Sequence, residues 1–195
     1  ALSFPLGVLL ALGRRSPLPA VSLVCTAWIE TVRGVPLVTI LFMTHILLPI
    51  SVPQIRIDRV VRAVAGLTLF SAAYLAEYVR GGLQAVPRGQ YEAAYALGLS
   101  GFRATVLVIL PQALRAVIPA IAGHFISLFK DTSLVAIIPL LELLGVARSV
   151  LANPRWLGYH AEVYAFVAAL FWVFSFGLSR ASRRLERAMG LGERH

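Results

Sequence analysis

The sequence has a single cysteine and little charge of either sign. Cys25 alone cannot form a disulfide within the chain, so no internal cross-link organises the fold. Only 14% of the 195 residues are charged, whereas 58% are hydrophobic. Because a soluble domain carries about 25% charged residues, this composition predicts a membrane protein.

The motifs of several enzyme classes are also missing. There is no G-x-x-x-x-G-K-[ST] phosphate loop for ATP, no H-E-x-x-H zinc motif and no G-x-S-x-G for a serine nucleophile. The four histidines show no metal-ligand spacing. Ser133, three residues after Lys130, is the nearest approach to a Ser-Lys pair. We therefore expect no catalytic residues, no bound metal and no cofactor held by this chain.

Basic residues outnumber acidic ones by 18 to 9, which gives a net charge of +9. The arginines lie between apolar runs instead of gathering on one polar face, so they indicate membrane orientation and not nucleic-acid binding. Those directly after the first and last apolar runs favour a cytoplasmic location for residues 13–17 and for the carboxyl-terminal tail, against three before the third run on the expected external side. They are Arg14 and Arg15; Arg180, Arg183, Arg184 and Arg187; and Arg56, Arg59 and Arg62.

The apolar runs predict one all-α transmembrane domain over residues 1–195. The expected spans are 1–13 (partial), 20–50, 60–83, 104–132 with a half-length helix at 134–146, and 161–180. Gly34 and Pro36 predict a break inside the second span. Because Ala1 to Leu12 is shorter than the roughly 20 residues of a full span, we expect the sequence to begin partway through a first helix.

Two pairs of opposite charge lie at helical spacing inside these runs. Glu30 and Arg33 are three residues apart, as are Glu77 and Arg80. For Glu30 and Arg33 two interpretations remain: an ion pair at a helix end, or a part of the substrate path. For Glu77 and Arg80, we expect an ion pair that braces the third span against the segment that follows it.

A polar cluster, Lys130-Asp131-Thr132-Ser133, interrupts the fourth apolar region. A charge at the bilayer centre costs about 2.5–3.5 kcal/mol on insertion scales, so these residues should be paired or face water. One interpretation is a salt bridge that fixes a helix break. The other is a lining of the substrate path, where hydroxyls and freed backbone groups meet a zwitterion.

Residues 87–111 form a polar interruption between spans. Pro87 ends the preceding run, and good helix formers predict a helix over 90–99 that Ser100-Gly101 terminates. Tyr91, Ala94, Tyr95 and Gly98 share one face of this helix. The face has no obvious core to pack on in its own chain, so it suits either a groove on another protein or the bilayer surface.

This segment resembles the EAA loop of ATP-binding-cassette importer permeases. The matching residues are Glu92-Ala93-Ala94, then Gly98, then Val108-Ile109-Leu110-Pro111, with Val108 where the family has isoleucine. The resemblance implies that the helix is a coupling helix that docks into a separate ATPase. The implied coupling residues are Tyr91, Glu92, Ala93, Ala94, Gly98, Leu110 and Pro111.

The resemblance covers residues from about Leu2 to Arg187 and implies a type I importer fold with five transmembrane helices in the bacterial inner membrane. It also implies two ATPase subunits that bind ATP and Mg, a second permease that is a copy or a paralogue, and an external amino-acid-binding protein. The segments YLAEYVRGGLQAVPRGQYEAA and FISLFKDTSL resemble the branch that imports polar or general L-amino acids.

Other functions remain as alternatives. Within the family, the substrate could instead be an opine, a quaternary amine or another small polar solute. An ion-coupled secondary transporter usually shows internal repeats of broken spans, and none is convincing in this sequence. An intramembrane enzyme lacks a catalytic constellation.

Overall fold

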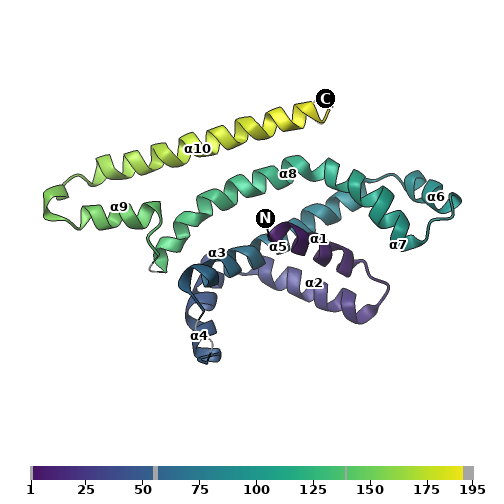
Figure 1. Ribbon diagram of the computed structural model, residues 1–195, viewed down its shortest axis with the longest axis horizontal. Coiled ribbons are helices and arrows are strands. Elements are labelled where there is room, and N and C mark those ends of the chain that lie inside the picture. Colours follow the sequence, from purple (N-terminus) through teal and green to yellow (C-terminus); the bar gives the residue numbers. More distant parts are fainter. Residues whose placement is uncertain (1, 55–56, 139, 191–195) are drawn as a thin grey trace. The chain divides into compact units, whose positions relative to one another are not determined.

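The computed structural model describes residues 2–190 except 55, 56 and 139, so the named Ala1 and Arg56 lie outside the described residues. Within the described part, every regular element is a helix (Figure 1). In chain order these are α1 (Ser3–Arg14), α2 (Pro19–Gly34), α3 (Leu37–Phe42), η1 (Met43–Leu47), α4 (Leu48–Ser51), α5 (Arg59–Ala85), α6 (Arg88–Ala96), α7 (Gly101–Arg103), η2 (Ala104–Ile109), α8 (Leu110–Asp131), η3 (Thr132–Ile137), α9 (Leu143–Leu151), η4 (Pro154–Trp156) and α10 (His160–Ala188). The all-α prediction is confirmed.

Among the residues that the structure describes, three helices are long and apolar enough to cross a membrane: Arg59–Ala85, Gly101–Ala136 and His160–Ala188. Pro19–Gly34 and Leu37–Ser51 reach that length only together, as one broken span. The break falls between Gly34 and Leu37, where the sequence predicts it, because Pro36 cannot continue the hydrogen bonds of the helix. Ser3–Arg14 is a shorter apolar helix.

The prediction of a half-length helix at residues 134–146 is wrong. The fourth span runs on as a 3₁₀ turn through Ile137, and a new helix begins only at Leu143. Glu142 starts that helix as its N-cap, since its Oε1 accepts from the Gly145 amide at 2.7 Å and its Oε2 from the Leu144 amide at 2.9 Å. The sequence pattern fails here because Glu142 lies inside an apolar run, where nothing local marks it as the start of a new helix.

Two prolines inside the apolar runs, Pro49 and Pro111, are accommodated by a wider, π-helical turn, and the helix continues past each of them. Pro111 and Pro49 each follow a π-helical stretch, η2 and η1, because each proline removes the amide that would bond four residues back. The carbonyl freed by Pro49 is that of His45, and Arg62 Nη1 donates to it at 2.7 Å. Pro111 ends the predicted segment 87–111 but also lies inside the predicted span 104–132, and the helix does continue through it.

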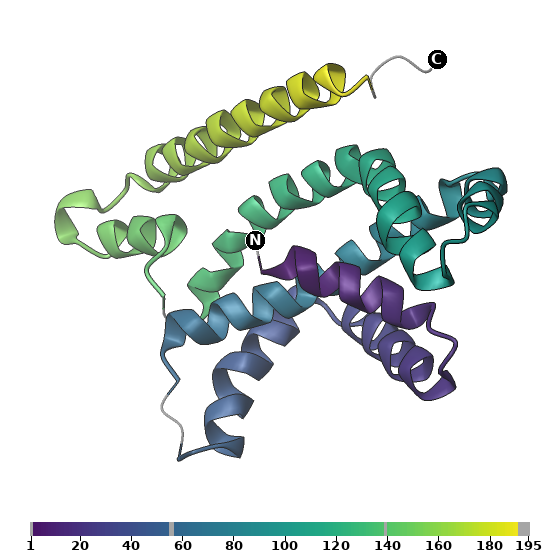
Figure 2. The ribbon, with the colours of Figure 1, turned by 45° about the vertical axis from the view of Figure 1, so that its right-hand side comes forward.

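The chain divides into two compact units, which are described separately. One contains the described residues of 1–34, 68–122 and 186–195, and the other those of 35–67 and 123–185. In the first unit, α1 and α2 form an antiparallel hairpin whose helices lie side by side (Figure 2).

The core of the first unit joins α1, α2, α5 and the start of α8 through small and branched residues. It comprises Ala11, Ile29, Ala76, Val79, Leu83, Val86, Ile109 and Ala113. Gly7 lies so close to α5 that a Cβ there would be 2.7 Å from Leu75 Cβ. In a membrane, such small residues let helix backbones approach and gain van der Waals contact, since lipid gives little hydrophobic drive for helix association.

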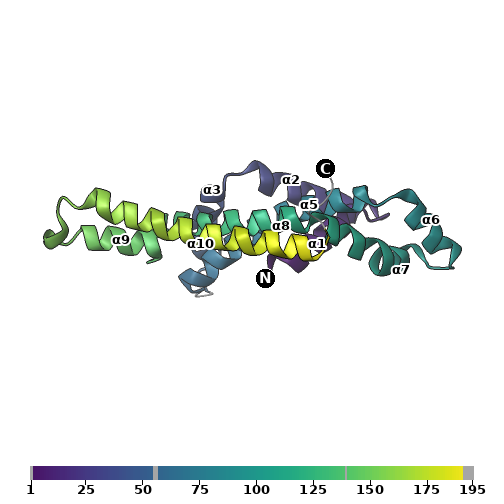
Figure 3. The ribbon, with the colours of Figure 1, turned by 90° about the horizontal axis from the view of Figure 1, so that it is seen from above.

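In the second unit, α9 lies beside the first part of α10 (Figure 3). Phe129 of α8 packs on two rings of α10, Phe171 at 5.6 Å and Phe174 at 6.2 Å between centroids. Aromatic pairs at this spacing add about 0.5–1.5 kcal/mol each beyond the burial of their area. They hold the carboxyl-terminal part of α8 against the final span.

Two adjacent glycines test the close packing of α5 on α8. A Cβ at Gly82 would meet the backbone carbonyl of Ala113 and lie 2.9 Å from Val117 Cγ1, whereas one at Gly81 meets nothing within 4 Å. We expect Gly82→Ala to lower the stability of the purified protein by about 1–3 kcal/mol. Gly81→Ala should leave it unchanged or raise it, since alanine favours helix. The measurement is the thermal unfolding midpoint in detergent, and equal shifts would contradict this packing.

Candidate functional site

The segment that resembles the EAA loop contains one complete short helix, α6. The helix covers Arg88–Ala96 instead of the predicted 90–99, and Gly98 rather than Ser100-Gly101 ends it. Gly98 has φ +76, its amide donates to Tyr95 O at 2.9 Å, and the Leu99 amide donates to Ala94 O at 3.2 Å. This is a Schellman turn, which needs a left-handed residue at that position. Ser100 then caps α7 by accepting from the Arg103 amide.

One face of α6 packs inside its own chain. Ala94 is 2% exposed, and the half-buried Tyr91 borders the core of the first unit. The Tyr91 hydroxyl donates to Leu83 O at 3.2 Å and accepts from Arg15 Nη1 at 3.2 Å. The prediction that this face has nothing to pack on is therefore wrong for Tyr91 and Ala94, because α6 packs on η2 and the Tyr91 hydroxyl bonds α5 and the residue after α1.

The rest of the α6 surface is open. Glu92 and Ala93 are exposed, Tyr95 is 51% exposed and Leu97 is 81% exposed. Among the described residues, the carboxylate of Glu92 has no hydrogen-bond or ion-pair partner. Further along, Leu110 packs on the core of the first unit, whereas Pro111 is exposed. The motif thus divides into residues that seat the helix and residues that it presents outward.

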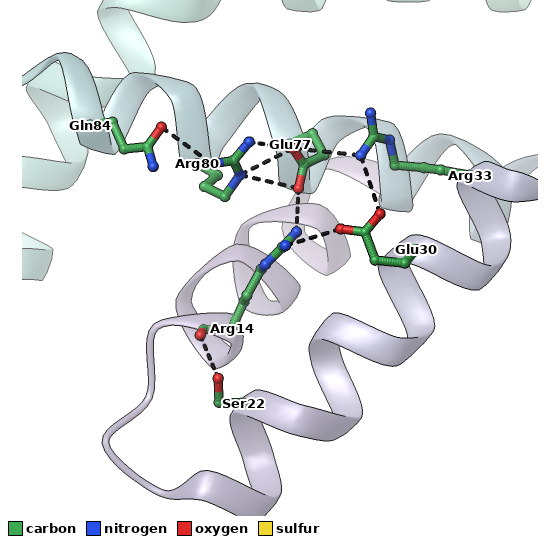
Figure 4. A network of polar contacts seen from close by, with 7 residues as sticks. All are labelled: Arg14, Ser22, Glu30, Arg33, Glu77, Arg80 and Gln84. Atoms are coloured by element: carbon green, nitrogen blue, oxygen red, sulfur yellow. Dashed lines mark hydrogen bonds and ion pairs between the residues drawn. The ribbon is translucent and has the colours of Figure 1, made fainter.

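Five charged side chains from three helices meet in a second feature, which we call the Glu77 cluster (Figure 4). Its members are Arg14 of α1, Glu30 and Arg33 of α2, and Glu77 and Arg80 of α5.

Glu77 is the centre of this cluster. Its Oε1 lies 2.5 Å from Arg14 Nη1, and its Oε2 lies 2.7 Å from Arg80 Nη2 and 3.5 Å from Arg33 Nη1. The Glu77 side chain is 14% exposed, so it has exchanged most of its water for guanidinium groups. A carboxylate in an apolar chain is tolerated when it is paired in this way.

The predicted ion pairs exist, but the cluster around them was not foreseen. Glu77 and Arg80 pair as expected, although they brace α5 against α1 and α2 and not against the following segment. Glu30 and Arg33 are only 3.9 Å apart, and Glu30 has a closer partner in Arg14 at 3.0 Å. Sequence reasoning missed Arg14, which stands beside Arg15 after an apolar run and resembles an orientation signal.

The polar cluster at residues 130–133 lies where α8 ends. Thr132 Oγ1 donates to Phe129 O at 2.6 Å and Ser133 Oγ donates to Lys130 O at 2.8 Å, so both hydroxyls bond carbonyls of the helix end. Lys130 is exposed and Asp131 is half-buried. Over the described residues no ion pair includes either of them, and a salt bridge therefore does not explain this helix end.

A pocket of about 420 Å³ lies between α9 and α10. Its lining is apolar apart from Glu162. A zwitterionic solute needs both a donor set and an acceptor set, and this lining offers a single carboxylate. The pocket therefore suits hydrocarbon better than a polar solute.

The fold agrees with what known proteins show. The sequence model of the family "Binding-protein-dependent transport system inner membrane component" matches residues 3–191. The chain belongs to this family. As an inner membrane component with several spans, it is a multi-pass membrane protein.

Relatives of this inner membrane component carry amino-acid transport in their names. The chain is 49% identical over 97% of its length to the inner membrane amino-acid ABC transporter permease protein YhdY of Escherichia coli K12. It is 50% identical over 96% to the glutamate/glutamine/aspartate/asparagine transport system permease protein BztC of Rhodobacter capsulatus. It spans 52% and 44% of these two proteins, about half their length. The probable glutamine ABC transporter permease protein GlnP of Bacillus subtilis is 36% identical over 95% of the chain, which spans 84% of that protein.

Two solved structures share the fold of this family member. A crystal structure of an amino acid ABC transporter with histidines matches with a TM-score of 0.83 and 30% identity, over 96% of this chain and 85% of that one. An inward-facing conformation of the MetNI methionine ABC transporter matches with a TM-score of 0.74 at 23% identity, over 96% and 85%. The second likeness concerns the fold alone. The type I importer permease fold is confirmed.

The Tyr91 hydroxyl, with its bonds to Leu83 O and Arg15, holds α6 on its own chain, and we call this contact the seat of α6. It can be tested with two tyrosines of the same helix. Tyr91→Phe keeps the ring but removes the hydroxyl between Leu83 O and Arg15, so we expect the free energy of unfolding to fall by about 0.5–1.5 kcal/mol. Tyr95→Phe is the control, since the Tyr95 hydroxyl makes no hydrogen bond in the described part of the chain and its removal should change nothing. Chemical unfolding in detergent gives both values. A larger loss for Tyr95 than for Tyr91 would contradict this seat.

Proposed function

We propose that this chain is a permease subunit of an ATP-driven importer for polar amino acids. The observation that carries the proposal is α6, a helix seated on α1 and α5 by Tyr91 with Glu92, Ala93 and Leu97 left open. This arrangement supplies a ready docking surface for a cytoplasmic ATPase, which would bind ATP and Mg itself. The relatives named for glutamine, glutamate, aspartate and asparagine favour polar amino acids as the substrate class.

The mechanism follows from docking at α6. When two ATPase subunits close on ATP, they move the docked helix, and its seat moves with it. The spans of this chain and of a second permease, a copy or a paralogue, then change from an inward-facing to an outward-facing packing. An external binding protein delivers the amino acid to the outward-facing state. We assign the polar residues Lys130, Asp131, Thr132 and Ser133 to the substrate path, where exposed Lys130 and half-buried Asp131 are free to meet a zwitterion.

Reconstitution of the complete complex in vesicles tests this function. With ATPase and binding protein present, glutamine or glutamate should stimulate ATP hydrolysis, and labelled amino acid should enter only when ATP is supplied. Uptake that follows an ion gradient without ATP contradicts the proposal. If only a quaternary amine stimulates ATP hydrolysis, the chain is an importer permease but its substrate is not a polar amino acid. In the same vesicles Lys130→Ala and Asp131→Ala should reduce uptake, and unchanged uptake in both removes these residues from the substrate path.

A single cysteine on the open face of α6 tests its location and its docking. In a Cys25→Ser background, Ala93→Cys should react with a membrane-impermeant maleimide only from the cytoplasmic side, because α6 is proposed to lie there. Binding of the ATPase should slow this reaction. Leu157→Cys is the control: it is exposed just before α10, at the end opposite the arginines expected to be cytoplasmic, and should show the opposite sidedness. Labelling of Ala93→Cys from outside would contradict the proposed orientation.

A further inference from the structure

The seat of α6 and the Glu77 cluster are neighbours along the same two helices. Tyr91 bonds Leu83 O, and Leu83 follows Glu77 by six residues, roughly 9 Å along α5. Tyr91 also bonds Arg15, and the preceding residue, Arg14, bonds Glu77. Both hydrogen bonds of the Tyr91 hydroxyl therefore lead to the same carboxylate within two helical turns.

On its other side, the cluster reaches the end of α2. Arg33 Nη1 lies 3.5 Å from Glu77 Oε2, and the next residue, Gly34, is the last of α2 before the break in the second span. Glu77 thus contacts one arginine from the helix that supports α6 and one from the helix that ends at the break. Among the five members, Glu77 is the one acidic group that bonds α5 to both neighbours (Figure 4).

Arg33 is shared between two carboxylates. Its Nη1 is 3.5 Å from Glu77 and 3.9 Å from Glu30 of its own helix, so both contacts are long. A small shift of the end of α2 would shorten one contact at the expense of the other, and Arg33 would stay paired in either arrangement. By contrast, the contacts of Glu77 with Arg14 at 2.5 Å and Arg80 at 2.7 Å are close. The cluster thus combines two close contacts with an arginine that lies between two carboxylates and can pair with either, and a switching element requires such an alternative.

The balance of charges in the Glu77 cluster makes Glu77 necessary for the exchange of Arg33 between two carboxylates. Three guanidinium groups surround two carboxylates, and Glu30 is 54% exposed and reaches only Arg14 and Arg33. Without the charge of Glu77, three arginines would share one exposed carboxylate, and no anion of the cluster would remain on α5. Repulsion would then separate the seat of α6 from the end of α2.

We propose that Glu77 is a positioning residue that couples the seat of α6 to the break in the second span, with Arg33 exchanging between Glu77 and Glu30 as the end of α2 moves. This inference rests on the proposed function, because movement of α6 by an ATPase is its input. Glu77 acts through the arginines that it contacts, Arg14 and Arg33, and we assign it no direct contact with substrate or ATPase.

The test uses the reconstituted complex and measures amino acid transported per ATP hydrolysed. Glu77→Gln should lower this ratio about tenfold, in the range of ordinary coupling between sites, while ATP hydrolysis persists because the open face of α6 is intact. Glu162→Gln is the matched control: the same change on an exposed residue of α10 should leave the ratio unchanged. A merely structural role of Glu77 would lower hydrolysis and transport together and overturn the inference.

A second variant keeps the test decisive if Glu77→Gln fails to fold. Arg33→Gln removes the two long contacts and the guanidinium over the Tyr74 ring, 5.7 Å from the ring centroid. The close contacts of Glu77 with Arg14 and Arg80 remain, so the unfolding midpoint should shift less than for Glu77→Gln, but the transport ratio should fall as far. A normal ratio in folded Arg33→Gln overturns the inference. If the wild-type complex shows no ATP-dependent uptake, the proposed function fails and the inference falls with it; if the wild type transports and both variants keep its ratio, only the inference fails.

Discussion

The carboxylate of Glu77 imposes the strongest constraint on the first unit. It is largely withdrawn from water in a chain that is 58% hydrophobic, and an unpaired charge in such surroundings is too costly to persist. Three arginines from α1, α2 and α5 neutralise it, so these helix ends must lie within reach of one another. Removing a partner from such a site costs more than the pair contributes, because the remaining charge is stranded.

Apolar packing and the cluster fix different aspects of this unit. Small residues such as Gly7, Ala11 and Gly82 allow α1 and α8 to approach α5 closely, but such contacts tolerate sliding of one helix past another. Ion pairs at defined distances select one register from those that packing permits. The two together place Arg15 and Leu83 where the Tyr91 hydroxyl can bond both, and α6 acquires its orientation from them.

The sequence predicts the helices much better than their contacts. Apolar length predicts the three long spans, and Gly34 with Pro36 predicts the broken one, because these are local properties. The seat of Tyr91 could not be predicted, since Arg15 is 76 residues away in the chain and nothing local marks it as a partner. Glu77 and Arg80 gave a local signal through their spacing, whereas Arg14, 63 residues from Glu77, did not. The helix over 134–146 failed because Glu142 acts as a cap, which composition alone does not reveal.

The seat of α6 also explains how so short a helix can exist. Nine residues are too few for a stable isolated helix, because nucleation is costly and few hydrogen bonds follow. Here the Schellman turn at Gly98 satisfies carbonyls at one end, and Tyr91 and Ala94 anchor one face to the core. The helix is therefore formed before any partner arrives, and docking does not have to order it. Preorganisation of this kind lowers the entropic cost of binding, so even a small open face of Glu92, Ala93 and Leu97 can serve as a docking surface.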